Sequence, residues 1–199
     1  MLLNRSAYLR ISDVQIKHHV AMYGAGTQST GMILMALTGH FNEKPNFAIF
    51  SDTGAEPNHV IEYKEYFSEY VKNEFDFNII TVQNKNLETD ILEYLKGHKK
   101  RVSQIPLRSK TGLMMRQCTQ DYKIDPSDKF IKKKLNIKRK NNNQANSVAL
   151  WMGISIDEIQ RMKRSVQWWK VLLYPLIENG YRRNDTIQFV KKHGLKEPP

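Results

Sequence analysis

Short apolar runs alternate along this chain with segments whose apolar residues recur at helical spacing, and this alternation is the strongest constraint on the fold. The apolar runs predict strands at residues 19–23, 46–50, 75–82 and 148–154. The helical spacing predicts helices at 29–37, 57–70, 87–96, from 125 onward, 157–162 and 185–193. Strands that alternate with helices are typical of a parallel sheet with helices on both faces. The sequence therefore predicts an α/β domain.

Capping residues predict where several helices begin and end. Gly39 is expected to end the first helix, because glycine tolerates the left-handed conformation found there. Asp125 is expected to cap a helix whose first position is Pro126, and Asp185 is expected to cap the last helix. Residues 97–119 are basic and without regular spacing, which predicts a long irregular loop.

Length, hydropathy and cysteine content narrow the class of protein. The chain has 199 residues, which suits one α/β domain. It has no run of about 18 apolar residues, and its N-terminus lacks the apolar core of a signal peptide, so no membrane association is expected. The single cysteine, Cys118, excludes an internal disulfide and suits a reducing compartment. We therefore expect a cytoplasmic protein.

The chain is strongly basic, with 31 Lys and Arg against 20 Asp and Glu, a formal net charge of +11. Such a surplus favours polyanionic partners, either nucleic acid or phosphorylated and sulfated small molecules. Much of it lies at residues 132–134 and 138–140. This basic run has two interpretations at this point, a solvated helix end or a contact surface for nucleic acid.

Residues 23–30, Tyr-Gly-Ala-Gly-Thr-Gln-Ser-Thr, lie between the first predicted strand and the first predicted helix. Gly24 and Gly26 can adopt positive φ without steric cost, and the N–H groups of the following helix point into the loop. This favours a phosphate cradle, although a tight turn without a ligand has the same pattern. The loop is neither a Walker A motif nor a dinucleotide fingerprint, because it lacks the preceding Lys and the third Gly.

Polar segments also follow the second and fourth predicted strands, at residues 51–56 and 155–157. In open parallel sheets, ligands bind beyond the carboxyl ends of the strands, where the strand order reverses. We therefore expect these segments to meet the 24–29 loop at one nucleotide site.

These segments resemble elements of the adenine nucleotide alpha hydrolase-like (PP-loop) superfamily, in particular phosphoadenosine phosphosulfate (PAPS) reductase-like proteins, including phage-encoded members. Residues 22–30 resemble the Ser-Gly-Gly-x-Asp-Ser pyrophosphate loop, and residues 50–56 resemble the Asp-Thr-Gly segment. Residues 116–126 resemble the Arg-x-Cys-Thr…Lys…Pro element, residues 151–164 the Gly-Ile-x-x-Asp-Glu…Arg element, and residues 174–176 the following Pro-Leu. The elements occur in the family's order across residues 19–195.

The resemblance implies a Rossmann-like three-layer α/β fold, with a twisted, mainly parallel sheet in a single PP-loop domain over residues 1–199. It implies an enzyme that binds an adenosine nucleotide, namely PAPS, adenylyl sulfate or ATP, with Mg²⁺ if the nucleotide is ATP. Two reactions fit. One is an oxidoreductase reaction, in which a thiol donor such as thioredoxin releases sulfite from an adenylyl sulfate. The other is attack on the α-phosphate of ATP with loss of pyrophosphate, as in thiolation of nucleobases.

The resemblance also implies the site residues, with Ser29, Asp52 and Lys123 in catalytic roles. The residues expected to bind the nucleotide are Gly24, Ala25, Gly26, Thr27, Gln28, Ser29, Thr30, Asp52, Thr53, Gly54, Glu56, Arg116, Lys123, Gly153, Ile154, Asp157, Arg161 and Arg164. Capping of the helix that follows Pro57 is an equal alternative for Asp52 and Thr53. No residue set has the spacing of a structural zinc site.

The chain departs from the family in ways that affect each reaction. Gln28 stands where ATP-cleaving relatives carry an Asp that helps to hold Mg²⁺. The cysteine-containing tail of true PAPS reductases does not follow Pro199, so the chain is either naturally short or incomplete. Cys118 is expected to be a buried thiol rather than the nucleophile. The alternative function is a non-catalytic nucleotide- or nucleic-acid-binding module that uses residues 97–119 and 132–140.

Overall fold

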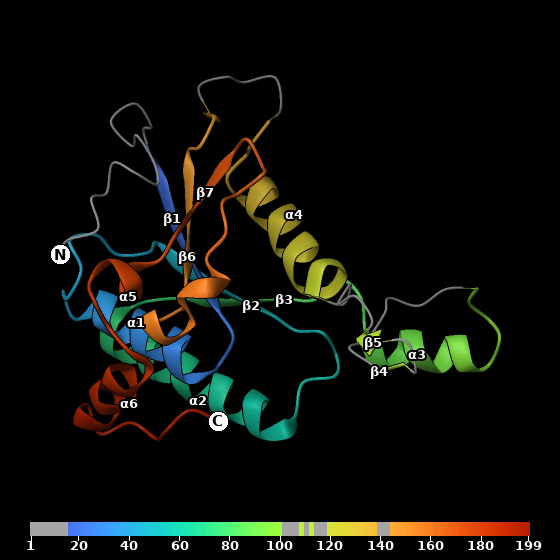
Figure 1. Cartoon of the computed structure of the whole chain (residues 1–199), viewed down its shortest axis with the longest axis horizontal. Coiled ribbons are helices and arrows are strands. Elements are labelled where there is room, and N and C mark those ends of the chain that lie inside the picture. The colour runs from blue at the N-terminus through green and yellow to red at the C-terminus, as the bar shows by residue number, and fades with distance from the viewer. Residues whose placement is uncertain (1–15, 101–107, 110–111, 114–118, 139–143) are drawn as a thin grey trace.

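A computed structural model of the chain describes residues 16–100, 108–109, 112–113, 119–138 and 144–199. Its centre is a sheet of five strands in the order β3-β2-β1-β6-β7, and all neighbouring strands are parallel (Figure 1). The strands are β1 (His18–Tyr23), β2 (Phe47–Ser51), β3 (Ile79–Val82), β6 (Val148–Met152) and β7 (Lys170–Leu173). The helices are α1 (Thr27–Leu37), α2 (Asn58–Phe75), α3 (Leu87–Leu95), α4 (Asp125–Lys134), α5 (Pro175–Glu178) and α6 (Arg183–Lys192).

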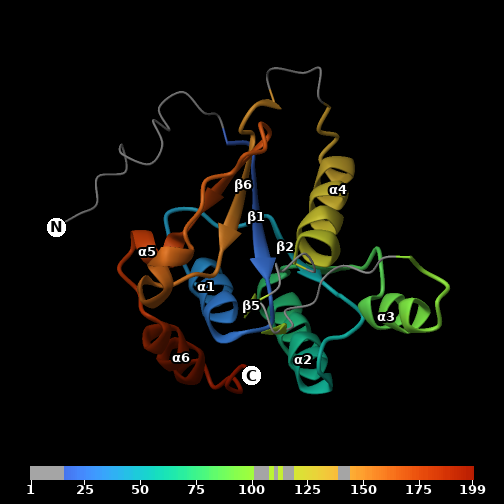
Figure 2. The ribbon, with the colours of Figure 1, turned by 45° about the vertical axis from the view of Figure 1, so that its right-hand side comes forward.

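The two faces of the sheet bury different helices, because successive side chains of a strand point to opposite faces. Tyr23 and Phe50 belong to a core that they share with α1, α2 and α6. Val20 and Ile49 belong to a second core, which Ile131 of α4 completes. Figures 1 and 2 show α1, α2 and α6 on one side of the sheet and α4 on the other. The fold is therefore a three-layer, Rossmann-like α/β fold, and the predicted fold class is confirmed.

Helices α1 and α6 pack at very short range. A Cβ atom placed at Gly31 would lie 2.5 Å from Thr186 Cβ, so only glycine fits at this point of α1. Both residues are fully buried. This contact holds the N-terminal half of α6 against the helix that follows β1.

Several predicted boundaries are wrong. Helix α2 continues to Phe75 and ends at Asp76, which has a left-handed φ of 50°, so the third strand begins only at Ile79. Asp125 does not cap α4, because a π-helix, η3 (Gln120–Ile124), runs directly into it and Ile124 has helical backbone angles. Asp185 is the third residue of α6 rather than its N-cap. It accepts a hydrogen bond from Arg182 N at 2.7 Å.

The predicted helix at residues 87–96 is present as α3 and lies apart from the main sheet. Helix α3 buries none of its residues, and Figures 1 and 2 show it to one side of the three layers. The short strands β4 (Arg108–Ser109) and β5 (Gly112–Leu113), within residues 97–119, pair with each other in an antiparallel hairpin. Of the helices in the described ranges, none has both the length and the apolar character that a membrane span requires.

A buried ion pair joins α4 to β7. Lys170 Nζ lies 2.5 Å and 2.7 Å from the two carboxylate oxygens of Asp128, and both residues are buried. Lys170 is the first residue of β7, which was not predicted as a strand. The pair thus explains why a lysine stands in a buried strand.

Candidate functional site

The strand order reverses between β1 and β6. From β1 the chain proceeds to β2 and β3 on one side of the sheet, and it later returns to place β6 and β7 on the other. In open parallel sheets, ligands bind beyond the carboxyl ends of the strands at such a switch point. The segments that leave β1 and β6 here are residues 24–26 and 153–155, so the topology brings together two of the three polar segments singled out in the sequence.

The loop after β1 leads into a helix end without a capping side chain. Gly26 is the N-cap of α1, its residue type offers no side-chain acceptor, and the first turn contains no acidic residue. The hydroxyl of Ser29 donates to Gly26 O at 3.0 Å and accepts from Gly24 N at 3.3 Å, which closes the loop on itself. Helix α3, in contrast, is capped by Asn86, which accepts from Thr89 N. The first N–H groups of α1 therefore lack the acceptor that a capping side chain supplies at α3.

The one residue of this loop with a left-handed backbone is not a glycine. Ala25, which is fully buried, adopts the left-handed conformation with a φ of 55°. Gly26 has a φ of −93°, and Gly24 also lies outside the left-handed region. A Cβ atom placed at either glycine would have no atom within 4 Å. Neither glycine uses the positive φ that its residue type allows, and neither steric crowding nor backbone conformation requires glycine at these positions.

Gly153, directly after β6, touches the first turn of α1. A Cβ atom at this position would lie 2.7 Å from Ser29 Cα and 2.8 Å from Ser29 N. Real Cβ atoms do not approach backbone atoms this closely, so glycine is required here for steric reasons. The contact fixes the segment after β6 against the loop after β1.

Gln28 connects the two sides of the switch point. Its Nε2 donates to Ser155 Oγ at 2.9 Å and to Glu158 Oε2 at 2.9 Å, while Arg161 Nη1 pairs with the same carboxylate at 2.8 Å. The hydrogen bond from Gln28, followed by the hydrogen bond and charge of Arg161, lowers the pKa of Glu158. An aspartate at position 28 would place a second negative charge beside Glu158. The neutral amide of Gln28 avoids this charge repulsion and donates a hydrogen bond to Glu158 instead.

Replacing Glu158 with glutamine is expected to destabilise the chain at neutral pH but not in acid. A carboxyl group whose pKa is lowered on folding contributes stability above its unfolded pKa, here near 4.5, and this contribution is lost as the pH falls through the folded value. Denaturant midpoints of the wild type and Glu158→Gln should differ at pH 7 and converge as the pH falls well below 4.5. Glu62→Gln, on an exposed part of α2, is the control. Equal midpoints at pH 7 would show that Glu158 gains no stability from these contacts.

The turn after β2 is closed by its own side chains. Asp52 Oδ1 accepts a hydrogen bond from Gly54 N at 2.7 Å. Thr53 Oγ1 donates to Glu56 Oε1 at 3.0 Å and accepts from Ala55 N at 3.3 Å. Gly54 has a φ of 73°, so glycine supports this turn. These contacts give Asp52 and Thr53 a structural role within the turn.

Helix α2 begins one residue after Pro57, its N-cap, and has no side-chain cap. Capping of α2 by Asp52 or Thr53, the alternative to ligand contact, is therefore wrong. The same end of β2 receives Lys123 from η3. Lys123 Nζ pairs with Glu56 Oε1 at 2.8 Å, and Lys123 O accepts from Ser51 Oγ at 3.1 Å. The structure thus brings together Lys123 and Glu56 at the carboxyl edge of the sheet.

Asp157 holds the start of α6 near the switch point. Its Oδ2 accepts from Arg183 N at 2.6 Å and from Ser155 Oγ at 3.2 Å, and Arg182 Nη1 lies 3.9 Å from its Oδ1. These contacts, with that to Arg183 N first, lower the pKa of Asp157. Arg182 and Arg183 were not predicted as site residues, because the sequence signal in this region, Asp185, indicated only a helix start.

The remaining predicted site residues are buried in the core, exposed, or outside the described residues. Thr27 and Thr30 are buried in α1, and Ile154 is buried in a small apolar cluster with α5. Arg164 is exposed after the 3-10 helix η5 (Ile156–Arg161). Arg116 lies outside the described residues, as does Cys118.

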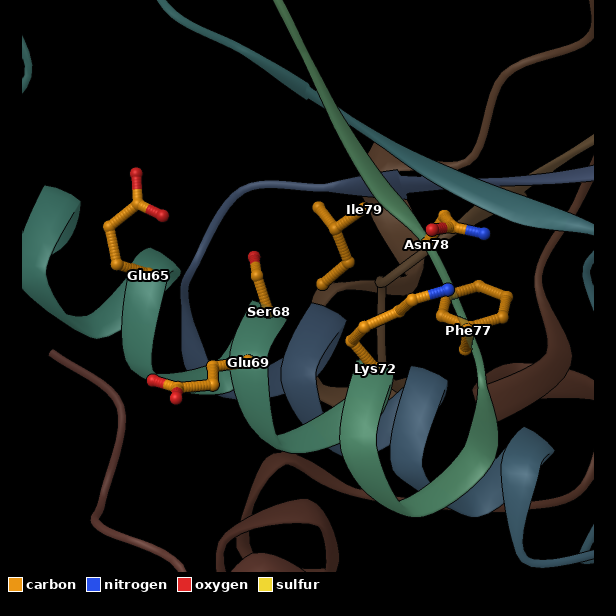
Figure 3. A pocket seen from close by; sticks show the side chains of 7 residues that line it. All are labelled: Glu65, Ser68, Glu69, Lys72, Phe77, Asn78 and Ile79. Atoms are coloured by element: carbon orange, nitrogen blue, oxygen red, sulfur yellow. The ribbon is translucent and has the colours of Figure 1, made fainter.

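A pocket of about 340 Å³ lies elsewhere, between α2 and the start of β3 (Figure 3). It is lined by Glu65, Ser68, Glu69, Lys72, Phe77, Asn78 and Ile79. Ile79 is the first residue of β3, so this pocket lies at the amino end of that strand. It is therefore distinct from the carboxyl edge where the polar residues converge, and none of the predicted site residues lines it.

No model of a known protein family matches this chain, and no curated protein matches it. The arrangement at the switch point is therefore the basis for inferring what the chain binds.

Proposed function

We propose that the chain is an adenosine-nucleotide-binding enzyme and that the nucleotide phosphates lie in the loop of residues 24–26 at the N-terminus of α1. The observation that carries the proposal is the pair Gly24 and Gly26, where a Cβ atom would meet no other atom within 4 Å and the backbone needs no glycine. Glycine at such positions allows a ligand to approach the backbone closely. The uncapped N-terminus of α1 adds N–H donors and a favourable dipole for an anion.

The surrounding cations fit the phosphate or sulfate end of the nucleotide. Arg161 and Lys123 each pair with a glutamate, Glu158 and Glu56, on the elements that leave β6 and β2. An incoming anion would be attracted by these cations and repelled by the glutamates, so binding would rearrange both pairs. Arginine is suited to hold an oxyanion with two parallel hydrogen bonds.

The residues around the loop offer a bound Mg²⁺ few free ligands, because the nearby Glu158 carboxylate is paired with Arg161. Gln28 offers no carboxylate, and its amide is already bonded to Ser155 and Glu158. Within the described ranges, no three His, Cys, Asp or Glu side chains gather as a metal site. We therefore favour PAPS or adenylyl sulfate, with an external thiol donor, over adenylylation by ATP.

Gly24→Val is expected to abolish nucleotide binding without changing the stability of the ligand-free chain. A ligand that binds only the folded state stabilises it by about 2.7 kcal/mol at a hundred times its Kd, and this appears as a rise in Tm. We would measure Tm with AMP, ATP plus Mg²⁺, adenylyl sulfate, PAPS and adenosine 3′,5′-bisphosphate. Wild type should be stabilised by the sulfated or 3′-phosphorylated nucleotides, and Gly24→Val should show no rise.

Asn42→Val, in the exposed loop before β2 at the opposite edge of the sheet, is the control and should behave like wild type. Selective stabilisation by ATP plus Mg²⁺ would favour the adenylylating reaction instead. The nucleotide site is wrong if no nucleotide raises the Tm of wild type, or if Gly24→Val keeps the full rise.

A further inference from the structure

The solvent-facing side of α4 carries lysines without acidic partners. Lys129, Lys133 and Lys134 are exposed, and within the described part of the chain none of them forms an ion pair with a carboxylate. Asp128, the acidic residue in the middle of the helix, is buried and paired with Lys170. The other acidic residue of α4, Asp125, is its first residue, so positive charge prevails over the rest of this side of the helix.

Two of these lysines line a pocket at the end of β3. The pocket has a volume of about 190 Å³. Its lining residues are Val82, Gln83, Asn84, Pro126, Lys129, Phe130 and Lys133. Lys129 and Lys133 are one helical turn apart, about 6 Å along the axis. Lys85 continues the exposed segment after β3, with its Nζ 6.0 Å from the ring of Tyr122. We call Gln83, Asn84, Lys85, Lys129 and Lys133 the α4 basic surface.

We infer that the α4 basic surface binds the phosphate backbone of a nucleic acid. Phosphate contacts in such complexes come mainly from Lys and Arg and from amide and hydroxyl side chains. The surface combines two lysines with the amides of Gln83 and Asn84 around one depression, and Lys85 follows them in the chain. This inference does not depend on the proposed nucleotide site, although both lie at carboxyl ends of strands of the same sheet.

Helix stabilisation alone does not account for this arrangement. Lysines in the last turn of a helix are favourable because they interact with the negative end of its dipole. Lys132, Lys133 and Lys134 are in the last turn of α4, but Lys129 precedes it. Lys85 is not part of the helix, and a dipole effect requires no amide-lined pocket beside it.

An acidic protein is a less suitable partner for this surface. Protein interfaces usually bury large apolar side chains at their centre. Among the described residues, the exposed large apolar side chains are Leu92, Tyr94, Leu95, Ile124, Ile159, Val166 and Trp168, and none of them belongs to α4 or β3. The apolar side chains at this surface, Val82, Pro126 and Phe130, are buried or half-buried in the floor of the pocket, so the groups that project from it are mainly lysines and amides.

The test is the binding of a fluorescein-labelled 20-base-pair DNA, measured by anisotropy from low to high salt. Each lost phosphate contact reduces the slope of log affinity against log salt by about 0.9 for duplex DNA, so Lys129→Gln/Lys133→Gln should reduce it by about 1.8. Lys44→Gln/Lys192→Gln is the matched control, because it removes the same charge from exposed lysines elsewhere, and Lys192 is also in a last helical turn. The control should bind with the wild-type slope.

Lys85→Gln tests the same surface from outside α4 and should reduce the slope by about 0.9. It keeps the inference testable if the double variant unfolds. The inference is overturned if wild type does not bind the DNA, or if the α4 variant and Lys85→Gln both keep the wild-type slope. It is also overturned if polyglutamate competes as well as unlabelled DNA at equal charge, since the surface would then not distinguish nucleic acid from an acidic protein.

Discussion

Lys170→Met should lower the free energy of unfolding by about 3–5 kcal/mol, the usual cost of removing one partner of a buried ion pair. The substitution leaves the Asp128 carboxylate buried without the ammonium group that now lies 2.5 Å and 2.7 Å from its oxygens. Burial, opposed by Lys170, already raises the pKa of Asp128, and loss of Lys170 would raise it further. The folded variant then binds a proton more tightly than the unfolded chain. Its stability should therefore fall as the pH rises from the ordinary aspartate pKa through the raised pKa of Asp128 in the folded state.

Urea denaturation of wild type and variants measures this effect. Lys170→Met/Asp128→Leu should recover most of the lost stability, because it replaces the whole pair with apolar side chains. Lys72→Met is the surface control. It breaks an exposed ion pair with Asp76 and should change the midpoint little. If Lys170→Met unfolds at the wild-type midpoint, the buried pair does not stabilise the contact between α4 and β7.

The second large effect is expected for Gly153→Ala, which should abolish nucleotide binding. The added methyl group would lie 2.7 Å from Ser29 Cα and 2.8 Å from Ser29 N, and neither is a flexible side-chain end. Either β6 or the first turn of α1 must therefore move, which displaces the proposed phosphate loop. Overpacking of this kind costs about 1–3 kcal/mol of stability. The rise in Tm caused by the nucleotide should disappear.

Gly31→Ala separates a local effect from general destabilisation. Its methyl group would meet Thr186 Cβ at 2.5 Å, so the same helix is overpacked at its contact with α6 rather than at the loop. Gly31→Ala should lose a similar amount of stability but keep the nucleotide-dependent rise in Tm. If Gly153→Ala keeps that rise, the nucleotide does not bind at the junction of β1, α1 and β6.

Much of the fold follows from local patterns in the sequence. The strands β1, β2 and β6 lie within two residues of their predicted bounds, because each is a short apolar run with a clear end. The parallel arrangement follows from the alternation of strands and helices. β7 was missed because its apolar run is short and begins with a lysine, Lys170. The partner that allows this lysine to be buried, Asp128, lies 42 residues away in the sequence.

The sequence by itself therefore determined the fold class, the position of the glycine loop and the polar segments beside it, since these depend on periodicity and on the residue types of short turns. Only the tertiary structure decided which side chains meet there. The hydrogen bonds of Gln28 to Ser155 and Glu158 join residues 127 and 130 positions apart. Such pairs depend on the order in which strands enter the sheet, which a local pattern does not encode. For the same reason, only the tertiary structure shows that Gly153 must be glycine, because it packs against α1, whereas a Cβ atom at Gly24 would meet no neighbour.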